Sequence, residues 1–157
     1  MMRSLGLVLL IQFFGLLAHA HCAELKVGSQ AIRSATDEFI IQDQDEQKLL
    51  PLKEESVGDC LSMTLVGGLQ KLVAVEFWGL EKGTSILVSN HLFGVIDLDK
   101  AEWAVEPFPL ESKVDGRGPP KKRIISTVEW RKSPQGMTLW KKLSSSKPVQ
   151  IWPETKR

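Results

Sequence analysis

The residues best suited to chemistry in this sequence are two tryptophans that stand beside basic side chains near its C-terminal end. Residues 130–132 and 140–142 share one order, in which a tryptophan precedes two cations: Trp130, Arg131 and Lys132, then Trp140, Lys141 and Lys142. An indole ring can stack on a sugar ring or a base while neighbouring cations hold anionic groups. We predict that these residues form a binding surface for an anionic polymer or a protein partner.

The same two segments are expected to be the strands of one hairpin. The residues between them, Ser133 to Gly136, favour a type I turn that ends in a left-handed glycine bulge. That register sets Trp130 directly opposite Trp140, whereas a two-residue loop without the bulge would pair Trp130 with Leu139 and separate the indoles. Paired indoles also commonly build the core of a β-protein, so a structural role for both is the alternative to binding.

Two histidines offer a second kind of chemistry, which is metal binding. If the chain is cleaved after Ala20, His21 becomes the N-terminal residue, and its amine and imidazole can chelate copper together with the imidazole of His91. His91 follows an asparagine between two expected strands, which places it in a turn. The alternative is that His21 is only the residue after the cleavage site and that His91 is an ordinary turn residue.

The sequence contains two cysteines, Cys22 and Cys60. In an oxidising compartment two thiols in one small domain usually pair. A Cys22–Cys60 disulfide would stabilise the fold by about 3–4 kcal/mol. Cleavage after Cys22 or Ala23 would instead leave Cys60 as a lone buried thiol.

The first twenty residues are typical of a secretory signal peptide. Arg3 gives a positive start, the run from Leu5 to Ala18 is apolar with one interruption, and small residues stand where a signal peptidase reads them before a cut after Ala20. The apolar run is short for a permanent membrane span. We therefore expect residues 1–20 to be removed and the remaining chain to be exported, periplasmic or secreted, with no transmembrane anchor.

The elements that carry these residues are predicted to be strands. From Glu38 onward, apolar or alternating segments recur about every ten residues between turn residues, which is typical of an all-β domain. No segment after residue 20 has a sustained helical period. We predict an all-β fold, a small antiparallel β-sandwich or barrel-like domain over residues 21–152, followed by a polar tail at residues 153–157.

Three local features are expected within this domain. Gly67-Gly68 predicts a hairpin that sets Met63 against Leu72. A proline suits Lys48–Lys53 to a sheet edge, and Pro148–Trp152 is a final extended segment. The backbone of either segment could pair with a strand of another chain.

Charge is divided unevenly along the chain. From His21 to Pro120 there are 9 Lys/Arg and 17 Asp/Glu, a balance of −8, whereas from Lys121 to Arg157 there are 10 Lys/Arg and 2 Asp/Glu, a balance of +8. An irregular connection from Pro107 to Pro120 is expected to separate the two parts. Such polarity can steer an anionic partner, or the two parts can neutralise each other.

The sequence contains no enzyme motif: no Gly-x-Ser-x-Gly elbow, His-Glu-x-x-His, Cys-x-x-Cys or phosphate-binding glycine loop. We therefore expect a protein without catalytic residues or a cofactor, and one that does not recognise a specific nucleic acid. The leading hypothesis is an exported binding or assembly accessory protein that uses the basic hairpin. One alternative is a strand-pairing subunit or chaperone-like interaction protein, and the other is a small copper-binding protein that uses His21.

Overall fold

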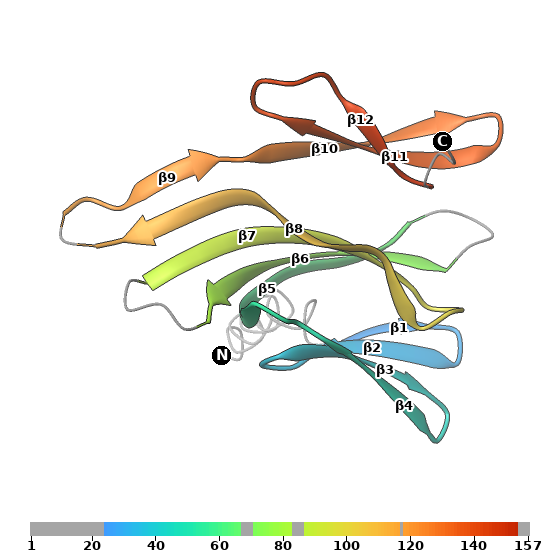
Figure 1. Ribbon diagram of the computed structural model, residues 1–157. Coiled ribbons are helices and arrows are strands. Elements are labelled where there is room, and N and C mark those ends of the chain that lie inside the picture. Colours follow the sequence, from blue (N-terminus) through green and yellow to red (C-terminus); the bar gives the residue numbers. More distant parts are fainter. Residues whose placement is uncertain (1–23, 67–70, 83–86, 117, 154–157) are drawn as a thin grey trace, which may run out of the picture.

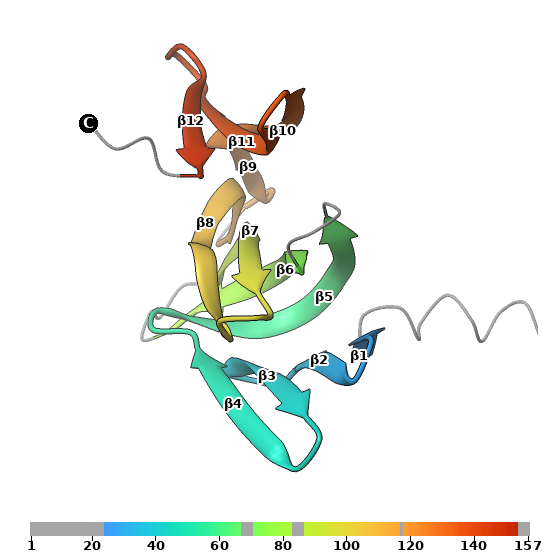
Figure 2. The same cartoon turned by 90° about the vertical axis from the view of Figure 1, so that its right-hand side faces the viewer.

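The computed structural model describes residues 24–66, 71–82, 87–116 and 118–153. Over these residues the chain forms twelve β-strands and no helix, and the strand pairs are antiparallel. The strands make three sheets that lie in layers, with the five-stranded sheet in the middle (Figures 1 and 2). The expected all-β antiparallel fold is confirmed.

In each sheet, strands that follow one another along the chain are also hydrogen-bonded neighbours. The first sheet consists of β1 (Glu24–Val27), β2 (Gln30–Ser34), β3 (Glu38–Asp43) and β4 (Glu46–Pro51). The middle sheet consists of β5 (Glu55–Val66), β6 (Leu72–Glu81), β7 (Leu87–Asp97), β8 (Glu102–Asp115) and β9 (Lys121–Ile124). The third sheet consists of β10 (Ser126–Ser133), β11 (Gly136–Leu143) and β12 (Val149–Trp152).

The middle sheet separates two hydrophobic cores, one on each of its faces, because successive side chains of a strand point to opposite faces. On β6, Val73, Val75 and Phe77 enter the core shared with the first sheet. Leu72 and Ala74 point the other way and enter the core shared with the third sheet. Since both faces are buried there, β6 begins with an unbroken apolar run instead of an alternation.

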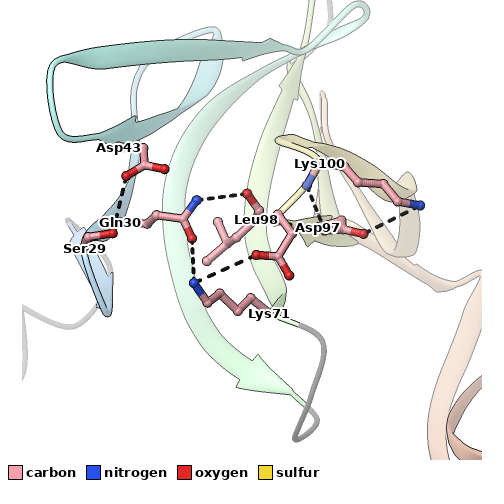
Figure 3. A network of polar contacts seen from close by, with 8 residues as sticks. Ser29, Gln30, Asp43, Lys71, Asp97, Leu98 and Lys100 are labelled. Atoms are coloured by element: carbon pink, nitrogen blue, oxygen red, sulfur yellow. Dashed lines mark hydrogen bonds and ion pairs between the residues drawn. The ribbon is translucent and has the colours of Figure 1, made fainter.

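A polar network fastens the first sheet to the middle sheet (Figure 3). Gln30, at the start of β2, is buried, and its Nε2 donates a hydrogen bond of 3.1 Å to the backbone oxygen of Leu98. Its Oε1 accepts a hydrogen bond of 3.4 Å from Nζ of Lys71, and the same ammonium lies 3.9 Å from Oδ1 of Asp99. A buried amide that is bonded through both its ends fixes how the two sheets meet.

The expected irregular connection from Pro107 to Pro120 is wrong over most of its length, because β8 continues as far as Asp115. The pairing of β7 with β8 shifts register at three places. Such irregularities allow prolines to lie within a strand although proline cannot donate to the ladder. Only the short segment between β8 and β9 connects strands here.

The hairpin predicted around Gly67-Gly68 is present as the pair β5–β6, although residues 67–70 themselves lie outside the described residues. Its expected register is wrong: Met63 pairs with Val75 and not with Leu72, because the paired strands are joined by a longer connection than two glycines. Lys48–Lys53 and Pro148–Trp152 contribute β4 and β12, and each of these strands lies at the edge of its sheet as expected.

Candidate functional site

The basic hairpin lies in the third sheet, and its register is the one expected for a two-residue loop without a bulge. A two-residue loop joins β10 to β11, and Ser133 pairs with Gly136. Gly136 has a φ of 125°, which favours glycine, but it stays paired within the ladder and does not form a bulge. Trp130 therefore pairs with Leu139, and the expected pairing of Trp130 with Trp140 is wrong.

The face of the third sheet that points toward the middle sheet is structural. Trp130 lies edge-on to Trp152, with ring centroids 6.3 Å apart, and both rings pack in the core around the buried Leu139. Lys141 is on the same face, and its Nζ lies 4.0 Å from the centroid of the Phe108 ring on β8. Burial in this contact lowers the pKa of Lys141. Trp130 and Lys141 thus help to hold the third sheet on the middle sheet.

The opposite face of the third sheet carries the candidate site. The guanidinium carbon of Arg131 lies 4.5 Å from the centroid of the Trp140 ring, and Nε1 of Trp140 donates a hydrogen bond of 3.0 Å to Oγ1 of Thr138. Nη2 of Arg131 also lies 3.0 Å from Oε2 of Glu129. Lys142, two residues beyond Trp140 on β11, shares this face and is exposed. We call Arg131, Trp140 and Lys142 the outer basic face.

The outer basic face points away from the other layers. The third sheet is the outermost layer on its side of the molecule (Figures 1 and 2), and its apolar contacts with β8 are made by the other face. The structure thus divides the predicted binding residues between two faces: Arg131, Trp140 and Lys142 on one, and Trp130, Lys132 and Lys141 on the other. The length of the hairpin loop decides which residues share a face, because it sets the register of the two strands.

A second basic segment continues from this face. All four side chains of β9, Lys-Lys-Arg-Ile, are exposed, and Nζ of Lys122 lies 3.0 Å from Oε1 of Glu111. Within the described part of the chain, Lys121 and Arg123 have no ion pair. Lys142 lines a shallow hollow together with Ile124, the last residue of β9. Lys142 therefore lies beside the end of a strand whose cations are exposed.

His91 lies in the middle of β7, so its expected position in a turn is wrong. Its Nε2 lies 2.9 Å from Oε2 of Glu76, and its ring centroid lies 5.5 Å from that of Trp78. The imidazole therefore contacts two side chains of the neighbouring strand β6. Among the described residues, no three His, Cys, Asp or Glu side chains form a group that could hold a metal ion. His21 lies outside the described residues, and copper binding through it stays a prediction.

The predicted disulfide and signal peptide also fall on residues that the structure does not describe. Cys60, on β5, is half-buried against the core between the first and middle sheets and is not a free thiol. Cys22, residues 1–20 and the tail from 154 to 157 lie outside the described residues, so the Cys22–Cys60 bridge and the export signal stay predictions. In the described chain no helix has the length and hydropathy that crossing a membrane requires.

A cavity of about 230 Å³, which no sequence pattern predicts, lies between the β4–β5 connection and β8. Glu55 forms part of its wall. Oε1 of Glu55 accepts a hydrogen bond of 2.7 Å from Nδ2 of Asn90, whereas Oε2 is buried without a hydrogen bond. Burial raises the pKa of Glu55 against the effect of the Asn90 hydrogen bond, and the carboxylates of Glu81 and Glu54 raise it further.

The carboxyl group of Glu55 fits beside β6 because residue 79 is a glycine and has no side chain there. A Cβ atom at position 79 would lie 2.6 Å from Cδ1 of Leu92 and 2.8 Å from Oε2 of Glu55. Oε2 therefore packs against the backbone of β6 and does not project into the cavity. We assign Glu55 to the packing of the middle sheet and not to the candidate site.

Comparisons with known proteins do not indicate a function for this chain. No protein-family model matches the chain, and neither curated proteins nor solved structures give a match. The outer basic face is therefore judged on its own chemistry.

Proposed function

We propose that this protein is an exported binding protein, and that it holds an anionic polymer through the outer basic face. The observation that carries the proposal is the contact between Arg131 and Trp140, whose guanidinium carbon and ring centroid are 4.5 Å apart on the third sheet, one of the two outer layers. In this pair the guanidinium lies over the indole ring, so the ring holds a planar cation in place on the surface of the sheet. Carboxylate, sulfate or phosphate groups bind such a guanidinium.

The distribution of charge supports an anionic ligand. Residues 121–157 contain 10 Lys/Arg against 2 Asp/Glu, and the whole third sheet lies within this segment. Such a surface attracts polyanions from a distance of about 8 Å at physiological salt. Glu129, 3.0 Å from Arg131 on the same face, offsets part of this attraction, but the ion pair is exposed and therefore weak enough for an anionic ligand to replace it.

The shape of the positive surface favours a polymer over a compact ligand. Arg131 and Trp140 lie on neighbouring strands, Lys142 follows along β11, and the end of β9, a strand with three exposed cations, lies beside Lys142. The cations are thus distributed over three strands instead of being gathered at one point. Cations spread in this way can contact successive charged groups of an extended chain, as basic grooves do with other polyanions.

Retention on immobilised heparin, a sulfated polysaccharide, tests the proposal with the wild-type chain, Lys142→Glu and Lys132→Glu. Both substitutions change the net charge equally, but Lys142 belongs to the outer basic face and Lys132 lies on the other face. We expect Lys142→Glu to elute at lower salt than both other proteins. Equal elution of the two variants would contradict binding through the outer basic face, and weak retention of all three proteins would contradict polymer binding.

A further inference from the structure

We infer that this protein forms a two-fold symmetric dimer in which β4 pairs antiparallel with β4 of a second copy. The inference does not depend on the outer basic face. It rests on the edge of β4, which lies at the margin of the molecule in both views (Figures 1 and 2). An exposed edge strand presents unpaired backbone N–H and C=O groups that another strand can bind.

The backbone groups on the free edge of β4 belong to Gln47, Leu49 and Pro51. A two-residue turn joins β3 to β4, so the even-numbered residues of β4 direct their backbone groups toward β3. The amide of Leu52 continues this parity, since it donates a hydrogen bond of 2.8 Å to the oxygen of Asp37. Pro51 has no N–H group, and its place on the free edge costs no bond to β3.

The other strands at sheet edges are short or protected. β5 is interrupted by two irregularities in its pairing with β6, and β9 carries Lys-Lys-Arg. β10 has eight residues in regular register with β11, but it carries three charged residues, Glu129, Arg131 and Lys132. β1 and β12 have four residues each. Bulges, clustered charges, prolines and short length all discourage edge pairing. β4 has six residues in regular register and no run of like charges, and its one proline, Pro51, lies at its end.

The sequence of β4 selects one symmetric register. An axis at Lys48 would place two lysines directly opposite each other, which is unfavourable. An axis at Leu49 places Leu49 opposite its own copy, and the two Leu49 residues exchange backbone hydrogen bonds. In the same register each Gln47 backbone amide donates to the Pro51 oxygen of the second copy, whereas the reverse bond to the Gln47 oxygen is absent because proline has no N–H group.

The side chains on this edge favour the same register. Leu49 is 51% exposed although it is a large apolar residue, and it pairs with Ile40 of β3, which is only half-buried. Dimerisation buries the two Leu49 side chains against each other, with Ile40 of each copy beside them. A single strand pair buries less area than a standard interface, so we infer a weak, reversible dimer.

Sedimentation velocity from about 10 μM to about 1 mM protein tests the dimer, a range suited to a weak complex. We expect a reversible monomer–dimer equilibrium. Leu49→Lys places two ammonium groups opposite each other and should raise the dissociation constant at least about tenfold. Leu61→Lys changes a leucine that is 45% exposed on the edge strand β5, and it should leave the equilibrium unchanged. A chain that stays monomeric, an unaffected Leu49→Lys variant, or equal effects of both variants would overturn the inference.

Backbone hydrogen exchange identifies the paired strand in the wild-type chain, so its result does not depend on how a variant folds. The amides of Gln47 and Leu49 should exchange more slowly at concentrations that favour the dimer, in proportion to the dimer fraction. The exposed edge of β5 should exchange at the same rate throughout. Protection at other amides without protection at these two would overturn the assignment to β4, even if a dimer forms.

Discussion

Removal of the two hairpin indoles one at a time should affect stability unequally, because Trp130 and Trp140 lie on opposite faces of the third sheet. Trp130 packs against Trp152 and the buried Leu139 between the sheets. Burial of about 100 Å² of indole surface contributes about 2.5 kcal/mol. The edge-on ring contact adds about 0.5–1.5 kcal/mol. We therefore expect Trp130→Ala to lower the free energy of unfolding by about 3–4 kcal/mol.

Trp140→Ala should cost only about 1 kcal/mol. The Trp140 ring contacts Arg131 at 4.5 Å and donates a hydrogen bond to Thr138, both on the outer face of the sheet. An exposed cation–π contact contributes about 0.5–1 kcal/mol. Truncation at this position opens no cavity, because water takes the place of the ring.

Urea unfolding at neutral pH measures both changes, with far-ultraviolet circular dichroism as the signal because each substitution removes a fluorophore. The expected order of midpoints is wild type, then Trp140→Ala slightly lower, then Trp130→Ala much lower, with an unchanged dependence on urea. Equal losses for the two variants, or a larger loss for Trp140→Ala, would refute the placement of the two rings.

Three further predictions concern Gly79, Glu55 and the N-terminus. Gly79→Ala should lower the free energy of unfolding by about 1–3 kcal/mol, because the new Cβ would lie 2.6 Å from Cδ1 of the buried Leu92; an unchanged urea midpoint would contradict this. The raised pKa of Glu55 lets the folded chain keep a proton that the unfolded chain releases, so this group's contribution to stability falls as pH rises from 4.5 to the raised value. Glu55→Gln should therefore gain stability relative to wild type above that window but not below it, and parallel pH profiles of the two proteins would argue against the shift. If residues 1–20 are removed as predicted, mass spectrometry of the mature chain should find His21 first; a start after Cys22 would exclude the Cys22–Cys60 disulfide and the copper site together.

The strands could be predicted from the sequence because alternation, apolar runs and turn residues are local signals. The faces of the hairpin could not, since they depend on whether Gly136 stays in the ladder or forms a bulge. A shift of one residue in register moves Trp130 and every second residue with it to the other face. The pattern Ser-Pro-Gln-Gly allows both outcomes, so the sequence alone does not predict which residues form the outer basic face.

Contacts between residues far apart in the sequence explain the other differences. Asn90 and His91 resemble a turn locally, but their side chains bond to Glu55 and Glu76, which are 35 and 15 residues away. These partners allow two polar residues to lie within β7. In the same way, β8 contains prolines because its pairing with β7 is irregular, and no local pattern in β8 shows this.

Binding of an anionic polymer by the outer basic face can be observed through the indole N–H resonances of the five tryptophans during titration with a heparin fragment. We predict that the Trp140 resonance shifts and saturates, and that Trp130 and Trp152, which pack between the sheets, stay in place. A titration that leaves Trp140 unmoved, or that shifts other indoles in its place, would contradict the proposed function.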